Sequence, residues 1–266
     1  MLIDIGANLT HDSFHPDFED VLARARDAGI RKMIVTGASV DGSEDAVALA
    51  HEHPGFLYAT AGIHPHHASD ATPGAIAKLA ALHRDPAVVA VGETGLDFFR
   101  DFSPRDDQVR SFEAHIELAI ASGLPMFLHE RDAYPRFAQV LHAYRDRLGD
   151  VVVHCFTGER DALYAYLDMD CHIGITGWIC DERRGTHLIP LVKDIPPARL
   201  MIETDAPYLM PRNIRPRPKT NRNEPHYLPY VCRFVADVLK VDYNELAART
   251  SDNATRFFRL STNEAG

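Results

Sequence analysis

Residues 88–130, VVAVGETGLDFFRDFSPRDDQVRSFEAHIELAIASGLPMFLHE, contain the clearest strand, helix and strand pattern in the chain. Two nearly continuous apolar runs, VVAV and PMFL, flank a segment of helical length. Such runs are typical of parallel strands buried on both faces. Ser103 suits a helix N-cap, Pro104 the first helical position and Gly123 the C-cap. One face of this helix is apolar and consists of Val109, Phe112, Ile116 and Ala119.

The alternation of apolar run and helical segment recurs along the whole chain. Eight runs are present: LIDIG (2–6), KMIVTG (32–37), LYATAGI (57–63), VVAVGETG (88–95), PMFLHE (125–130), VVVHCF (151–156), HIGITG (172–177) and LMIETD (200–205). Eight such units in 266 residues predict an α/β fold, a (β/α)₈ TIM barrel, which typically needs about 250 residues. A doubly wound open sheet is the alternative. No repeat or low-complexity linker divides the chain, so a single domain is expected over residues 1–266.

Composition and charge narrow the class of protein. A net charge of -10 argues against a protein that coats duplex DNA through a broad basic face, because that mode neutralises many phosphates. It is compatible with a nuclease that grips one strand end. Four cysteines without any Cys-x-x-Cys spacing indicate reduced thiols and a cytoplasmic location. Neither a signal peptide nor an apolar run of membrane-spanning length is recognisable, so no membrane partner is expected.

Polar residues interrupt the apolar runs at their C-terminal ends, where a TIM barrel builds its active site. They are Asn8, His64 and His66, Glu93, His129, His154, and Glu203 with Asp205. Carboxylates and imidazoles are costly in an apolar barrel unless they are paired or bind a metal. The mixed nitrogen and oxygen donors of Glu93, His129, His154 and Asp205 predict a divalent metal site. A single histidine at a strand end is otherwise more often only hydrogen-bonded.

The remaining histidines in helical or loop segments are expected at the surface. They include His51, His53, His83, His115, His142 and His187. None of them lies at the C-terminal end of one of the eight apolar runs.

A block of cations follows the last apolar run. It contains Arg212, Arg215, Arg217, Lys219 and Arg222, with no acidic residue between Asp205 and Glu224. The Pro-rich segment 207–225 is interpreted as a long loop after the eighth strand, so these cations lie at the catalytic face. Arg215 and Arg217 are candidate phosphate contacts, Asn223 a further substrate-binding candidate, and Tyr208 or Trp178 a platform for a base. The alternative is that the cations only balance an acidic surface.

Six ordered motifs, GIHPH (62–66), VGETGLD (91–97), PMFLHER (125–131), VVHCFTG (152–158), GITGW (174–178) and IETDAPYLMP (202–211), resemble the TatD family of metal-dependent deoxyribonucleases. The resemblance covers nearly the whole chain and is strongest to the TatD branch. It implies an amidohydrolase-like barrel and a hydrolase of DNA phosphodiesters. The implied activity is that of a 3′-5′ exonuclease preferring single strands, with a role in DNA repair or DNA degradation.

The same resemblance implies a role for each candidate residue. Glu93 would bind or bridge metal ions, and His129 and His154 would be ligands. Asp205 would bind metal and orient or deprotonate the attacking water. His64 and His66 would lie beside the scissile phosphate, and Arg131 is a candidate phosphate contact.

The first apolar run departs from the wider family, in which most relatives carry a His-x-His pair there. Gly6 and Asn8 occupy those positions, which favours an oxygen-rich site and Mg²⁺, with Mn²⁺ or Zn²⁺ as alternatives. Single-stranded DNA or DNA 3′ ends are the expected partners, with RNA as a further substrate and no protein partner. Two alternative functions are a D-aminoacyl-tRNA deacylase-type esterase and a catalytically inactive nucleic-acid-binding barrel.

Overall fold

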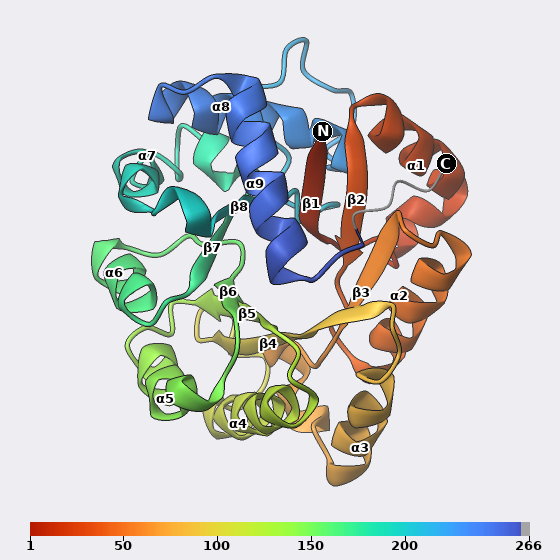
Figure 1. Cartoon of the computed structure of the whole chain (residues 1–266), viewed down its shortest axis with the longest axis vertical. Coiled ribbons are helices and arrows are strands. Elements are labelled where there is room, and N and C mark those ends of the chain that lie inside the picture. The colour runs from red at the N-terminus through yellow and green to blue at the C-terminus, as the bar shows by residue number, and fades with distance from the viewer. Residues whose placement is uncertain (262–266) are drawn as a thin grey trace.

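Eight parallel strands form one sheet in the computed structural model, which describes residues 1–261 (Figure 1). Their spatial order is their order in the sequence. The strands are β1 (Leu2–Ala7), β2 (Ile30–Val35), β3 (Leu57–Ala61), β4 (Val88–Asp97), β5 (Met126–Arg131), β6 (Val151–Val153), β7 (His172–Ile175) and β8 (Leu200–Ile202). Each overlaps one predicted apolar run. The expected single domain over 1–266 includes residues 262–266, which lie outside the described residues.

The sheet curls until its first and last strands meet. Ala7 pairs in parallel with Ala206, just beyond β8. Asn8 N donates to Ala206 O at 2.7 Å, and Asp205 N donates to Gly6 O at 2.8 Å. This contact brings the sheet close to a closed barrel, confirms the predicted TIM-barrel fold and rules out the open doubly wound sheet.

Helices surround the strands on the outside (Figure 1). They are α1 (Phe18–Asp27), α2 (Val40–Glu52), α3 (Pro73–Leu82), α4 (Arg105–Ser122), α5 (Arg136–Tyr144), α6 (Arg160–Asp168), α7 (Leu188–Leu191), α8 (Leu228–Leu239) and α9 (Tyr243–Phe257). Short 3₁₀ turns join several of them, among them η2 (Pro65–Asp70) after β3, η4 (Gly177–Cys180) after β7 and η7 (Pro225–Tyr227) before α8.

The predicted boundaries of the helix between β4 and β5 need one correction. α4 begins at Arg105, one residue later than expected, and Pro104 rather than Ser103 is its N-cap. The Ser103 hydroxyl instead donates to His66 O at 2.9 Å and fastens the loop after β3. At the other end Gly123 adopts φ 69°, the left-handed C-cap conformation that the sequence predicts.

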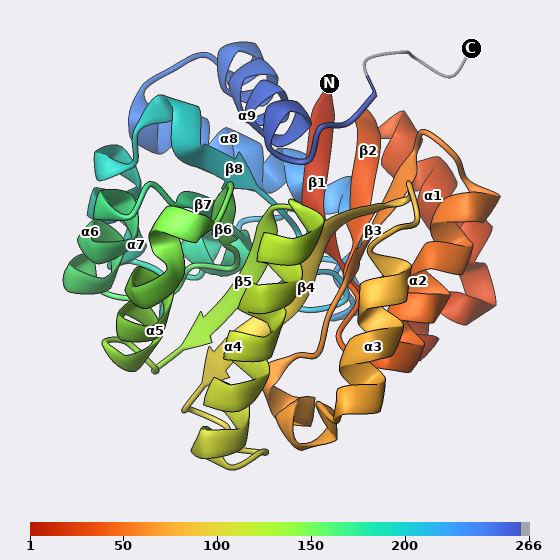
Figure 2. The same cartoon turned by 60° about the horizontal axis from the view of Figure 1, so that its bottom comes forward.

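The apolar interior of the barrel fills its N-terminal half and leaves the other end to polar side chains. Phe127, Val152 and Met201 point inward from β5, β6 and β8. Helix α9 lies across this end (Figure 2), and Phe257 at its end and Phe258 just after it pack against the same cluster. Strand alternation then turns the next inward positions, two residues later, toward the C-terminal mouth. These positions include His129 and His154, so the packing of the lower barrel sets the height of the candidate site.

Candidate active site

Imidazoles from three strand ends converge on one carboxylate at the barrel mouth. Glu93 Oε1 lies 2.8 Å from His154 Nε2, 3.1 Å from His129 Nδ1 and 3.4 Å from His64 Nε2. His64, Glu93 and His129 each offer a ligand atom within 4.8 Å of the others. The register of β4 against β5 shifts between Val91 and Thr94, beside the inward-pointing Glu93. The structure thus brings together four of the residues singled out in the sequence.

Asp205 lies across the mouth, outside this closest group. Its Oδ1 accepts a hydrogen bond of 3.0 Å from Asn8 Nδ2, which links the end of β1 to the segment after β8. Burial raises the pKa of Asp205 to about 7, and the negative charges of Glu93 and Glu203 add to that effect. The carboxyl therefore sits where an added cation would favour its ionised form.

The donor set around Glu93 fits a divalent metal ion. A carboxylate oxygen has two lone pairs, so hydrogen bonds alone do not account for three nitrogens gathered around Glu93 Oε1. Ligand atoms that share one ion at about 2.1 Å lie roughly 3 Å apart, as Glu93 Oε1 lies from His154 Nε2 and from His129 Nδ1. In addition, the buried Nε2 of His129 has no hydrogen-bond partner among residues 1–261. Imidazole nitrogens with carboxylate oxygens are ligands that several divalent ions accept.

Electrostatics in the cluster favour a positive charge beside Glu93. Burial alone would raise the pKa of Glu93, but the neighbouring imidazoles outweigh it and hold that pKa well below its usual value. Burial opposes charge on His129, yet the nearby carboxylates of Asp97 and Glu93 raise its pKa to about 9. For His154, the charges of Glu93 and Glu203 outweigh burial and raise the pKa well above its ordinary value. A field that stabilises protons in this way also stabilises a bound cation.

Glu203 is a site residue to which the sequence assigned no role. It is fully buried, and its Oε2 lies 3.3 Å from His154 Nδ1 while Oε1 accepts from Cys155 N at 2.5 Å. A carboxylate in this position fixes the ring orientation of a metal-binding histidine. A Cβ on Gly6 would collide with Glu203 Oε2, and one on Gly174 would lie 2.6 Å from Oε1. Gly6 therefore does more than replace an imidazole, because its missing side chain makes room for Glu203.

Asp97, at the end of β4, is the second residue without a predicted role. Its Oδ2 lies 2.7 Å from His66 Nε2 and 3.6 Å from His129 Nε2, while Oδ1 accepts from the backbone of Phe99 and Arg100. Its position at the end of an apolar run, inside the motif VGETGLD, was an available signal. Asp97 joins His66 to the rest of the cluster.

Known proteins resemble this chain over nearly its whole length. The model of the TatD related DNase family matches residues 3–259. The chain belongs to this TatD-related family. A protein of Edwardsiella piscicida named 3′-5′ ssDNA/RNA exonuclease TatD is 50% identical over 260 residues, which are 98% of this chain and 100% of that protein. A protein of the same name from Pantoea vagans is 48% identical over 260 residues, with the same coverage.

Solved structures of TatD-related proteins share the architecture. A TatD homologue from Escherichia coli K12 superposes with a TM-score of 0.88 at 28% identity and covers 98% of both chains. A hydrolase TatD family protein from Entamoeba histolytica superposes with a TM-score of 0.88 at 25% identity, again over 98% of both chains. The amidohydrolase-like barrel predicted from the sequence is confirmed.

The cation block of this TatD-related chain divides into two kinds of residue. Arg222 is paired with Asp17 at 2.7 Å and Glu224 at 2.7 Å, and Arg212 with Glu182 at 2.7 Å. Both of these arginines hold the loop to the barrel. By contrast, three side chains are exposed and have no carboxylate within 4.0 Å among the described residues, namely Arg215, Arg217 and Lys219.

The other substrate-binding candidates differ in exposure and in the hydrogen bonds that they already make. Tyr208 is 51% exposed beside His11, and Arg131 ends β5 in a half-buried position. Asn223 is fully buried, and its Nδ2 donates to Thr204 O at 2.9 Å and Tyr208 O at 2.6 Å. Its amide is therefore engaged within the loop that carries Asp205. Contact of Asn223 with substrate remains a prediction, and the structure gives it a clear role in holding that loop.

Two of the histidines expected at the surface are buried instead. His115 on α4 accepts from Ile63 N at 3.0 Å through Nε2, and its Nδ1 donates to Ser111 O at 2.7 Å. His83, just after α3, donates through Nε2 to Ala61 O at 2.9 Å. The prediction failed because helical periodicity did not show that these imidazoles face the end of β3. Together they fix the backbone that leads to His64.

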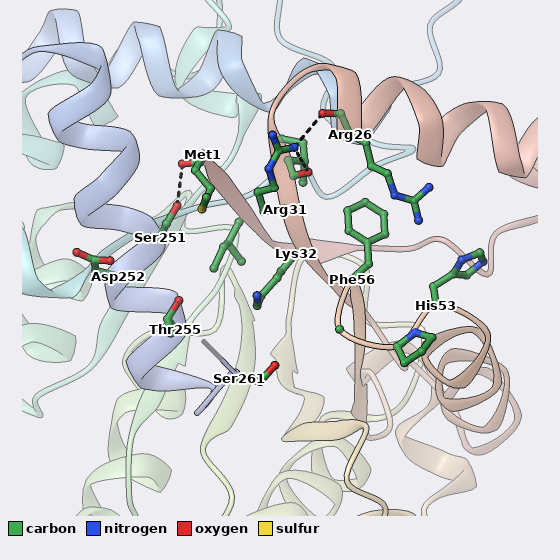
Figure 3. A pocket seen from close by; sticks show the side chains of 14 residues that line it. Met1, Arg26, Arg31, Lys32, His53, Phe56, Ser251, Asp252, Thr255 and Ser261 are labelled. Carbon is green, nitrogen blue, oxygen red and sulfur yellow. Dashed lines mark hydrogen bonds between the residues drawn. The ribbon is translucent and has the colours of Figure 1, made fainter. Parts of the chain in front are cut away.

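A cavity of about 770 Å³ opens at the opposite end of the barrel, near the starts of β1 and β2 and beside α9 (Figure 3). Met1, Arg31, Lys32 and Thr255 are among its lining residues. None of the predicted site residues lines it.

Among residues 1–261, none of the helices combines the length and apolar character that crossing a bilayer requires.

Proposed function

We propose that this chain is a metal-dependent 3′-5′ exonuclease that acts on single-stranded DNA and also accepts RNA. The observation that carries the proposal is the convergence of His64, His129 and His154 on Glu93 at the barrel mouth, with Asp205 beside them. The TatD names of relatives about half identical over nearly the full length support the choice of substrate.

Mg²⁺ is the proposed metal, and its proposed ligands are Glu93, His129, His154 and Asp205. β1 contributes no imidazole, because Gly6 and Asn8 stand where a histidine pair would add nitrogen ligands, and this favours an oxygen-rich site. When bound, such an ion supplies an acidified water and stabilises the charge that develops on the phosphoryl oxygens.

Asp205 is the proposed general base. Asn8 holds one carboxylate oxygen, which leaves the other to take a proton from the attacking water. A cation bound beside this carboxyl would keep it ionised at neutral pH, which is the state that accepts a proton. The attack forms a bond from the water oxygen to phosphorus and breaks the bond from phosphorus to the 3′ oxygen.

His64 and His66 are proposed to serve the phosphate and the departing 3′ oxygen. Burial lowers the pKa of His64 to about 3, so its ring is neutral at pH 7. Because His66 N donates to His64 Nδ1 at 3.1 Å, the proton lies on Nε2, where it can bind a phosphoryl oxygen. His66, held by Asp97, then donates a proton to the 3′ oxygen. Arg215 and Arg217 would draw the strand end toward this site.

This activity would take place in the cytoplasm, on DNA ends left by damage or degradation. Cys155, Cys171, Cys180 and Cys232 are all free thiols, as proteins of a reducing compartment usually have.

The test follows a 5′-labelled single-stranded oligonucleotide on a gel after chelator treatment and return of Mg²⁺, Mn²⁺ or Zn²⁺. A ladder that shortens from the 3′ end with metal, and is absent from Glu93→Ala, is the expected result. An oligonucleotide that stays intact with every metal would overturn the proposal, and aminoacyl-tRNA would be the next substrate.

A further inference from the structure

Two phenylalanines stand in solvent at the edge of the candidate active site. Phe99 is 55% exposed and Phe102 is 67% exposed, both in the loop that joins β4 to α4. No other phenylalanine among residues 1–261 is exposed. Exposed apolar side chains that gather at one place usually mark a surface that binds something. The Phe102 ring also packs edge-on against His66, with ring centroids 4.7 Å apart, so this pair begins at the proposed catalytic residues.

Arginine side chains pack near these rings and link them to a third aromatic residue, Trp178. Arg100 Cζ lies 5.5 Å from the Phe99 ring centroid and 6.0 Å from that of Phe102. Arg131 Cζ lies 4.8 Å from the Phe99 centroid and 4.9 Å from that of Trp178 on η4. Rings and guanidinium groups therefore alternate across the C-terminal ends of three different strands, β4, β5 and β7.

Arg184 completes the row at the far side. Its Cζ lies 4.2 Å from the Trp178 centroid, and its Nε donates to Asp181 Oδ2 at 3.0 Å, which holds the guanidinium in place. The buried indole Nε1 of Trp178 has no hydrogen-bond partner among the described residues. We call this row the aromatic ladder; its members are Phe102, Arg100, Phe99, Arg131, Trp178 and Arg184.

The chemistry of the ladder matches single-stranded nucleic acid. Bases stack on aromatic rings whatever their sequence, and guanidinium groups bind the phosphates between them. In a duplex the base faces are already covered by their neighbours, so a stacking surface selects strands whose bases are free. Its position beside His66 places it where nucleotides next to the cleaved bond would lie.

We propose that the aromatic ladder stacks the unpaired bases nearest the 3′ end and thereby selects single strands. This inference rests on the proposed exonuclease function and adds the residues that recognise the substrate. It also assigns a role to Phe99 and Phe102, for which the sequence suggested none.

The test measures KM and kcat of Phe99→Ala and Phe102→Ala on a single-stranded oligonucleotide. Phe99→Ala is expected to raise KM about tenfold with kcat little changed, since loss of one stacked base typically weakens binding about 5- to 150-fold. Phe102→Ala should raise KM by a similar factor and also lower kcat, because the Phe102 ring packs against His66. Phe99→Trp should keep the wild-type KM, and Phe99→Leu, apolar without a π face, should resemble Phe99→Ala. Tyr164→Ala is the matched control, because Tyr164 is a 41% exposed aromatic on the outer helix α6.

A second arm uses oligonucleotides with one abasic site placed at successive positions from the 3′ end. Wild-type protein should lose affinity when the abasic site reaches the stacked position, and Phe99→Ala should lose little more there. Equal KM values for wild type and both alanine variants, with thermal unfolding unchanged, would overturn the ladder. If wild-type protein fails to shorten DNA with any metal, the exonuclease proposal itself fails, which is a separate outcome.

Discussion

The barrel mouth and the helical shell beside β3 both bury histidines, but in opposite electrical surroundings. At the mouth, His129 and His154 face Glu93, and their pKa values are raised. In the shell, His115 meets only backbone groups, and burial lowers its pKa to about 4. Burial is common to both regions, so burial alone does not mark a metal site. A carboxylate partner outweighs burial only where it comes close, because His64 also faces Glu93, at 3.4 Å, and keeps a lowered pKa.

The neutral state of His115 follows from its two partners. Ser111 O can only accept and Ile63 N can only donate, so the ring must carry its proton on Nδ1 and accept at Nε2. A second proton on Nε2 would remove the bond to Ile63. At the mouth both nitrogens of His154 face carboxylate oxygens, of Glu93 and Glu203, which only accept, so that ring can carry both protons.

Glu93→Gln should have the largest effect, because it removes the charge that distinguishes the mouth from the shell. Loss of nuclease activity by about 10³-fold or more is expected, since one metal-holding carboxylate becomes a neutral amide. Isothermal titration with Mn²⁺ should show weak or no binding. Glu130→Gln is the control, because Glu130 is also buried but accepts from Ala133 N and Tyr166 Oη outside the barrel. Equal metal affinity in Glu93→Gln and Glu130→Gln would contradict the assignment.

The next largest effect is expected in the pH dependence of the free energy of unfolding, to which the buried His115 contributes. Between pH 6.5 and about 4 the unfolded chain protonates His115 and the folded chain does not, so the free energy of unfolding should fall as the pH drops through this window. The contribution of this group is about 3 kcal/mol over the full window. His115→Gln, whose amide can both donate and accept, should show a flatter dependence in urea denaturation at pH 7 and pH 4.5.

The control for that series is His142→Gln, since His142 is exposed on α5. It should keep the wild-type slope. A slope that is unchanged in His115→Gln would mean that the buried ring takes up its proton without breaking the contact to Ile63.

Glu203→Gln tests whether the Glu203 carboxylate orients His154 for metal binding. Losing the carboxylate that holds His154 should weaken metal binding about 10- to 100-fold, as outer partners of metal ligands usually do. Gly6→Ala should act in the same direction, because the added methyl group displaces Glu203. Metal titration measures both, and circular dichroism checks the fold. Wild-type affinity in both variants would show that His154 is oriented by other contacts.

The smallest effect is expected from the exposed cations of the loop. The double change Arg215→Glu with Arg217→Glu should raise KM for single-stranded DNA about 3- to 10-fold and flatten its dependence on salt, because fewer phosphates are neutralised. Lys78→Glu with Arg84→Glu makes the same change of charge on exposed residues near α3. If both double variants change KM equally, the loop cations only balance net charge.

Much of the candidate site could be predicted because it depends on local pattern. A polar residue at the end of an apolar run, such as Glu93, His129 or His154, has its place set by strand direction and alternation. Glu203 and Asp97 also end such runs, but the sequence does not show which histidines their carboxylates contact. Glu203 reaches His154 from 49 positions away, and only the closed barrel brings the two side chains together.

The eight strands, the end of the barrel that carries the polar residues and the family of the chain all follow from patterns in the sequence. Which arginines lack an acidic partner depends on the tertiary fold, because Arg222 meets Asp17 across 205 positions while Arg215 has no carboxylate nearby among the described residues. The same holds for His115, whose helix gave no sign that it faces β3. Strand patterns are short-range and survive in the sequence, whereas ion pairs and buried hydrogen bonds join distant segments and exist only after the barrel has closed.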